Sequence, residues 1–151
     1  MKGFPLKAFL GECHVLFSYP QNIVILLARW LIAYGFAVPA LVKINNLGGT
    51  IVWFEEISIP FPVLAAYLVS SVETLGIVLL VLGLFTRYIS ILLGAIMLGA
   101  ILFVHFPHGF SAANNGMEIP LYYFIFLMIF ASYGAGKYSF DHLLFKNDEY
   151  E

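Results

Sequence analysis

Five ionisable residues stand inside or at the ends of long apolar segments of this chain: Arg29, Lys43, Glu73, His105 and Glu118. A charged side chain in hydrocarbon costs about 2.5 kcal/mol or more unless a partner or a wet cavity receives it. Carboxylates and imidazoles can transfer protons, and cationic side chains can donate hydrogen bonds to a ligand. These five residues are therefore the candidate functional residues.

The composition predicts a membrane protein. Hydrophobic residues make up 62% of the 151 residues and charged residues only 11%, whereas a soluble domain carries roughly 25% charged residues. The net charge is −2 and the seven Lys and Arg residues form no basic run, so nucleic acid is not an expected partner. The expected partner is the lipid bilayer.

The apolar segments predict four transmembrane helices, because a spanning helix needs about 20 apolar residues. They lie at 23–44, 62–85, 88–106 and 119–136. Turn-forming residues 45–50 and the prolines 60 and 62 separate the first two, and a loop rich in Gly, Asn and Ser at 108–116 follows the third. The expected fold class is all-α, an integral membrane four-helix bundle.

The two ends of the chain differ from the spans. Residues 1–22 carry apolar residues at helical spacing with polar residues opposite, which predicts an amphipathic helix at the membrane interface. With four spans, most Lys and Arg residues fall on the side of the termini, so both termini and the short tail 144–151 are expected in the cytoplasm. The loop around Trp53 is then expected to lie at the outer interface.

A rise of about 1.5 Å per residue assigns a depth to each polar side chain. Arg29 and Glu73 both fall inside the bilayer on successive spans, which predicts a buried ion pair between them. Lys43, His105 and Glu118 fall near the outer ends of three different helices and predict a second polar cluster that opens outward.

Structural roles are the alternative for each of these residues. The pair of Arg29 and Glu73 would then only fix the register of two helices, and Lys43 would extend its ammonium to the interface. Small residues four positions apart, such as Ala95 and Gly99, allow close approach of helices within the bundle or between subunits. A homo-oligomer is therefore an open alternative.

Several classes of redox and metal chemistry lack a motif in this sequence. The chain has one cysteine, Cys13, so it cannot form an intrachain dithiol couple. Haem, iron–sulfur, nucleotide and zinc motifs are absent. His105, His108 and Glu118 could be brought together around a metal, but their spacing matches no zinc motif and no metal site is predicted. Tyr122, Tyr123 and Tyr133 are expected mainly to pack.

Eight short pieces in sequence order resemble the DoxX family of small bacterial membrane proteins, over about residues 23–143. They are LAR (27–29), Lys43, IPFP (59–62), ETLG (73–76), LGLFTR (82–87), HFPHGF (105–110), NGME (115–118) and GAGKYSFD (134–141). The resemblance implies a four-helix protein of the bacterial cytoplasmic (inner) membrane with both termini inside. It also implies that the charged residues of the family correspond, in this chain, to the five residues identified above.

Relatives in the wider DoxX and DoxD group are associated with quinone-linked sulfur oxidation, with membrane complexes that resist thiol stress, and more distantly with assembly. The leading hypothesis is therefore a membrane subunit of a quinone-linked redox system with a separate redox partner or a sulfur compound as electron donor. Glu73, His105 and Glu118 would be catalytic proton carriers, and Arg29, Lys43 and Glu73 would bind the quinone. The alternatives are a non-enzymatic assembly factor or scaffold and, less favoured, a small transporter.

Overall fold

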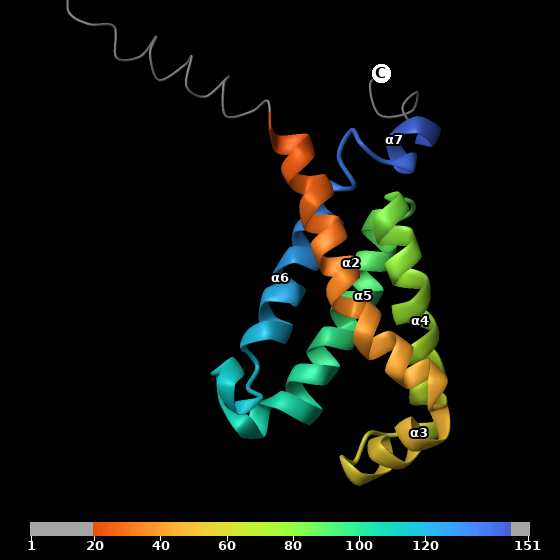
Figure 1. Ribbon diagram of the computed structural model, residues 1–151, viewed down its shortest axis with the longest axis vertical. Coiled ribbons are helices and arrows are strands. Elements are labelled where there is room, and N and C mark those ends of the chain that lie inside the picture. The colour runs from red at the N-terminus through yellow and green to blue at the C-terminus, as the bar shows by residue number, and fades with distance from the viewer. Residues whose placement is uncertain (1–19, 146–151) are drawn as a thin grey trace, which may run out of the picture.

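Four helices form the body of the molecule in a computed structural model, which describes residues 20–145 (Figure 1). They are α2 (Gln21–Asn45), α4 (Pro62–Leu82), α5 (Thr86–Ala100) and α6 (Glu118–Tyr133). The helix α5 continues as a π-helical turn, η1 (Ile101–His105), and a 3₁₀ turn, η2 (Phe106–His108); a second 3₁₀ turn, η3 (Ala112–Asn114), precedes α6. No strand occurs between residues 20 and 145, so the predicted all-α fold class is confirmed.

Within residues 20–145, three helical stretches are long and apolar enough to cross a membrane: Gln21–Asn45, Pro62–Leu82 and Thr86–His108. They match the first three predicted spans closely. The fourth predicted span, 119–136, is observed as the shorter apolar helix α6 of 16 residues, which is about 24 Å long. It ends at Tyr133 because the next residue, Gly134, has a φ of 78° that stops the helix.

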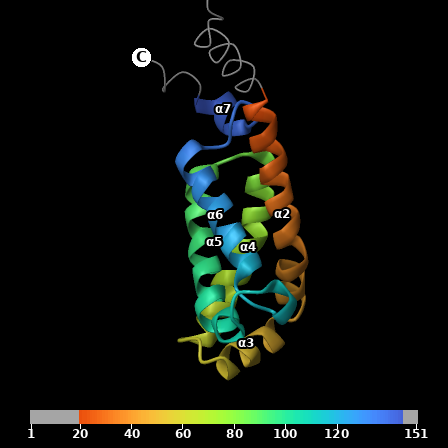
Figure 2. The same cartoon turned by 90° about the vertical axis from the view of Figure 1, so that its left-hand side faces the viewer.

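The bundle consists of two helix pairs. The helix α2 packs on α4, and α5 packs on α6 (Figures 1 and 2). Between the pairs lies a core of fully buried apolar side chains that includes Ile32, Phe36, Leu80, Leu93 and Phe130. The outward faces remain apolar and exposed, as expected for helices whose solvent is lipid.

A helix that the sequence analysis assigned to a loop crosses one end of the bundle. This helix, α3 (Leu47–Glu56), begins beside the two glycines of the predicted turn. The Asn46 side chain caps it by accepting a hydrogen bond from Gly49 N at 3.0 Å, and Phe54 is buried with only 4% of its surface exposed. Capping and burial of Phe54 therefore stabilise a helix that local turn signals did not predict.

The opposite end of the bundle is closed by the segment 134–145, which includes the short helix α7 (Phe140–Phe145) (Figure 1). The start of α2 lies at this same end. The predicted interfacial helix falls on residues 1–19, which lie outside the described residues, and on residues 20–22, where α2 already begins at Gln21. Residues 146–151 of the predicted tail also lie outside the described residues.

Asp141 of α7 caps the start of α5. Its two carboxylate oxygens accept hydrogen bonds from Phe85 N at 2.7 Å and Thr86 N at 2.9 Å, and its own amide donates to Gly83 O at 2.9 Å. A carboxylate at this position satisfies helix amides that have no partner within the helix.

Replacing Asp141 with alanine is expected to lower the free energy of unfolding by about 1–2 kcal/mol, the usual value of an N-terminal cap. Denaturant titration in detergent would measure the loss. Asp141→Asn, which retains one acceptor oxygen, should lose less, and equal stability of wild type and Asp141→Ala would contradict the capping role.

Candidate functional site

A cavity of about 720 Å³ lies between the two helix pairs, in the half of the bundle that α3 covers. Apolar side chains from α2, α3, α4, α5, η1 and α6 make most of its wall. The ionisable side chains in the wall are Lys43, Glu73, His105 and Tyr123. Three of the five candidate residues, Lys43, Glu73 and His105, therefore meet at one cavity.

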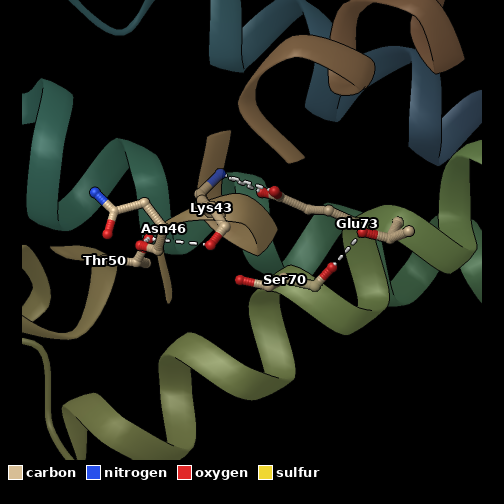
Figure 3. A network of polar contacts seen from close by, with 6 residues as sticks. Lys43, Asn46, Thr50, Ser70 and Glu73 are labelled. Atoms are coloured by element: carbon tan, nitrogen blue, oxygen red, sulfur yellow. Dashed lines mark hydrogen bonds and ion pairs between the residues drawn. The ribbon is translucent and has the colours of Figure 1, made fainter. Parts of the chain in front are cut away.

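Lys43 and Glu73 form an ion pair in the wall of the cavity (Figure 3). The Lys43 ammonium donates to both carboxylate oxygens of Glu73, at 2.7 Å and 3.0 Å. The Glu73 side chain is 2% exposed and that of Lys43 is 16% exposed. The charge of the buried carboxylate is thus balanced by the Lys43 ammonium, and the pair is costly to break once formed.

Local polar contacts surround the ion pair (Figure 3). The Thr50 hydroxyl of α3 donates to Asn46 O at 3.0 Å and lies 3.5 Å from Lys43 O. On α4, the Thr74 hydroxyl donates to Ser70 O at 2.8 Å, within the same helix. The contact with Lys43 O places α3 against the last turn of α2, which carries the residue that pairs with Glu73.

The predicted ion pair between Arg29 and Glu73 is wrong. Arg29 is fully buried near the other end of α2, where its guanidinium donates to Leu80 O at 3.1 Å and to Tyr138 O at 2.6 Å. It does not line the cavity. Lys43 lies 14 residues further along α2, about 21 Å of helix, and this is the part of α2 that Glu73 contacts.

Gly83 makes room for the Arg29 guanidinium. Gly83 ends α4 in the left-handed conformation with a φ of 67°, and a Cβ at this position would collide with the guanidinium and with Ser139. Arg29 therefore joins α2, the end of α4 and the segment 134–145, which is a structural role.

His105 lies in the π-helical turn that extends α5, and it lines the cavity. Its Nδ1 lies 2.7 Å from Asn115 O. Because a carbonyl oxygen can only accept, Nδ1 carries the hydrogen and Nε2 of a neutral ring is the acceptor. Single π-turns inside helices are common at functional sites because they redirect side chains.

Glu118 does not join the cluster that was predicted with Lys43 and His105. It does not line the cavity; one carboxylate oxygen accepts from Ala112 N at 3.0 Å and the other from the Tyr122 hydroxyl at 3.0 Å. Both contacts stay within the loop before α6 and its first turn, so Glu118 orders that loop.

His108 is exposed, and its Nδ1 lies 3.0 Å from Val104 O. Across residues 20–145, no three His, Cys, Asp or Glu side chains come close enough to hold a metal ion.

Sequence reasoning missed the aromatic part of the site. Trp53 and Phe54 of α3 line the cavity, although they were expected at the outer interface. Tyr123 of α6 also lines it, and its ring lies 5.6 Å from that of Phe36. No local pattern distinguishes Tyr123 from Tyr122, because only the rotation of α6 in the bundle decides which of the two faces inward.

The sequence profile of the DoxX family matches residues 24–106, more than half of the chain. The chain belongs to the DoxX family. The matched region contains α2, α3, α4, α5 and η1, and with them the three candidate residues of the cavity wall.

Curated relatives of this DoxX protein include an uncharacterised protein of Haemophilus influenzae, 30% identical over 83% of this chain and 86% of that protein. A Bacillus subtilis protein named "Putative oxidoreductase CatD" is 35% identical over 52% of this chain and 58% of its own length. The Escherichia coli "Inner membrane protein YphA" is 28% identical over 59% of this chain and 64% of its own length. No solved structure matches the chain significantly.

Proposed function

We propose that this DoxX protein binds a quinone in the cavity and acts as the membrane subunit of a redox system. The observation that carries the proposal is the apolar cavity of about 720 Å³ with the ion pair of Lys43 and Glu73, and His105, in its wall. Small-molecule sites are typically cavities of roughly 300–1,000 Å³ with apolar walls and a few convergent polar groups.

The residues of the wall fit a quinone ring, which needs apolar surfaces and donors for two carbonyl oxygens. The Lys43 ammonium has three hydrogens, and Glu73 accepts two of them. The third is available to a ligand carbonyl, and the Tyr123 hydroxyl in the same wall is a second donor. Because the ion pair has no net charge, it favours a neutral head group with acceptor oxygens over an anion.

A bound quinone would accept two electrons and two protons to give a quinol. Glu73 and His105 would act as proton carriers that first take up a proton from water: the Glu73 carboxylate would be protonated before it donates, and His105 would bind its proton at Nε2, because Nδ1 is held by Asn115 O. The electrons would come from a partner protein or a small sulfur compound, since the chain has a single cysteine and no dithiol couple of its own. The name of the Bacillus subtilis relative supports an oxidoreductase role.

We also propose the inner membrane as the location, with both termini in the cytoplasm. Arg87 and Lys137 belong to the end of the bundle at which α2 starts, whereas Glu55 and Glu56 lie in α3 at the other end. This distribution agrees with the rule that Lys and Arg gather on the cytoplasmic side. The name of the Escherichia coli relative supports the inner membrane.

The test is to purify the protein from its native membrane in mild detergent and to quantify quinone per chain. Glu73→Gln is expected to keep the fold and lose quinone about tenfold or more, because an amide holds the Lys43 ammonium less firmly than a carboxylate does. Glu55→Gln removes an exposed carboxylate outside the cavity and should retain quinone.

Well-folded wild-type protein without quinone would overturn the proposal. A scaffold without a ligand would instead show no quinone in wild type or in either variant. The two readings therefore differ in the quinone content of the wild type, whereas Glu73→Gln weakens the ion pair and lowers the melting temperature under both.

A further inference from the structure

The cavity wall includes three residues spaced four positions apart along α5 and η1: Ala95 and Gly99 of α5, and Phe103 of η1. Ala95 and Phe103 are exposed, the latter to 40%, although both also line the cavity. A Cβ at Gly99 would meet no heavy atom within 4 Å outside its own helix. The cavity is therefore open at these residues rather than closed by a neighbouring helix.

The rotation of α5 gives the direction in which this opening faces. A Cβ at Gly76 of α4 would touch Leu93, and one at Gly94 would touch Met128 of α6, so consecutive residues of α5 face α4 and α6. Gly99 follows Gly94 by five residues, which at about 100° per residue turns it about 140° away from the direction of α6. It follows Leu93 by six residues, which turns it about 120° away from the direction of α4, so Gly99 faces outward from both helices. The opposite edge of the cavity is formed by α4, through Ala65 and Val69.

We propose that the cavity opens sideways into the hydrocarbon between α4 and α5, and that a ligand with a long apolar tail enters there with its tail left in the lipid. This inference rests on the proposed quinone site and adds its ligand class: a neutral head group on a prenyl tail. Ala65, Ala95 and Gly99 have small side chains or none, and every residue named at this edge is apolar. A tail in this opening would need no polar partner, and the head would reach the ion pair from inside the membrane.

Gly99→Trp tests the opening without disturbing the fold. Gly99 lies in a regular helix where an added Cβ meets nothing within 4 Å, so a side chain can begin there without a clash, and the substitution removes the helix penalty of glycine. Gly48→Trp is the matched control, because Gly48 also has open space within a helix and does not line the cavity.

Two readouts separate failure of this inference from failure of the proposed function. First, each substitution is placed in a background of Trp30→Phe and Trp53→Phe, and indole fluorescence is recorded in bilayers of lipids brominated on the acyl chain. Strong quenching of the Gly99→Trp protein, and weaker quenching of the Gly48→Trp protein, is the expected result. An unquenched Gly99→Trp protein would overturn the lateral opening whatever the ligand is.

Second, the two single variants are compared for copurified long-chain quinone and for binding of an added quinone that carries one isoprene unit. Gly99→Trp should lose the long-chain quinone and bind the short one as wild type does, whereas Gly48→Trp should retain both. Retention of the long-chain quinone by Gly99→Trp, or loss of both quinones, would overturn the entry route. Absence of quinone from wild type would overturn the proposed function, while the quenching result would still establish whether the cavity opens to lipid.

Discussion

Replacing Lys43 with methionine is expected to lower the free energy of unfolding by about 3–5 kcal/mol, the cost of leaving one member of a buried ion pair without its partner. Glu73 is only 2% exposed, and both of its oxygens accept from the Lys43 ammonium. Methionine has a similar length and packs well in an apolar wall, so the loss would come from the carboxylate rather than from a void. Denaturant titration in detergent would measure it.

The double variant Lys43→Met with Glu73→Leu is the control. Removing both charges together should recover most of the lost stability, because apolar pairs of similar volume often replace buried ion pairs without cost. Its quinone content should nevertheless be low, since the polar groups of the proposed site are gone. Equal stability of Lys43→Met and wild type would contradict the ion pair.

Replacing Arg29 with alanine is expected to lower the free energy of unfolding by about 2–5 kcal/mol, since a fully buried side chain would leave a cavity and two carbonyl oxygens without donors. A local effect should accompany the loss, because one of these carbonyls belongs to Tyr138, directly after the exposed Lys137. Trypsin should cleave after Lys137 faster in the variant, as followed by mass spectrometry.

Trp30→Phe is the matched control for Arg29→Ala. Trp30 lies next to Arg29 on α2 and also donates across to α4, at 3.2 Å to Val81 O, but it is 49% exposed. Its loss should change stability little and leave the rate of cleavage after Lys137 unchanged. Equal cleavage of Arg29→Ala and wild type would mean that Arg29 does not hold the segment 134–145.

These two experiments address different parts of the same bundle. Arg29 stabilises the end at which α2 begins and α7 closes the bundle, whereas Lys43 and Glu73 lie in the half with the cavity. Glu73→Gln should lose quinone, whereas a stable variant such as Arg29→Met should retain it. This result would support a ligand-binding role for Glu73 and a structural role for Arg29. Arg29 is predicted from the sequence to bind the ligand, but in the structure its guanidinium donates to the backbone carbonyls of Leu80 and Tyr138.

The sequence by itself determined the all-α membrane class, the four helices of the bundle and the charged residues that stand in or beside its apolar segments. These features are local. The length of an apolar segment decides whether it can span a bilayer. A charge in such a segment is costly in lipid, so residues such as Lys43, Glu73 and His105 are candidates wherever they lie in the bundle. Three of the five residues singled out in this way line the cavity.

Only the tertiary structure decided which charges meet. Depth along each helix paired Glu73 with Arg29 and placed Lys43 in a separate outer cluster, whereas the crossing of α2 with α4 brings Arg29 to Leu80 O and Lys43 to Glu73. The rotation of α6 in the bundle places Tyr123 in the cavity wall. The side chain of Asn46 caps the helix α3, which forms where the glycines had predicted a turn. Partners and cavity walls depend on helix rotation and crossing, which follow from the packing of all helices at once and leave no local signal in the sequence.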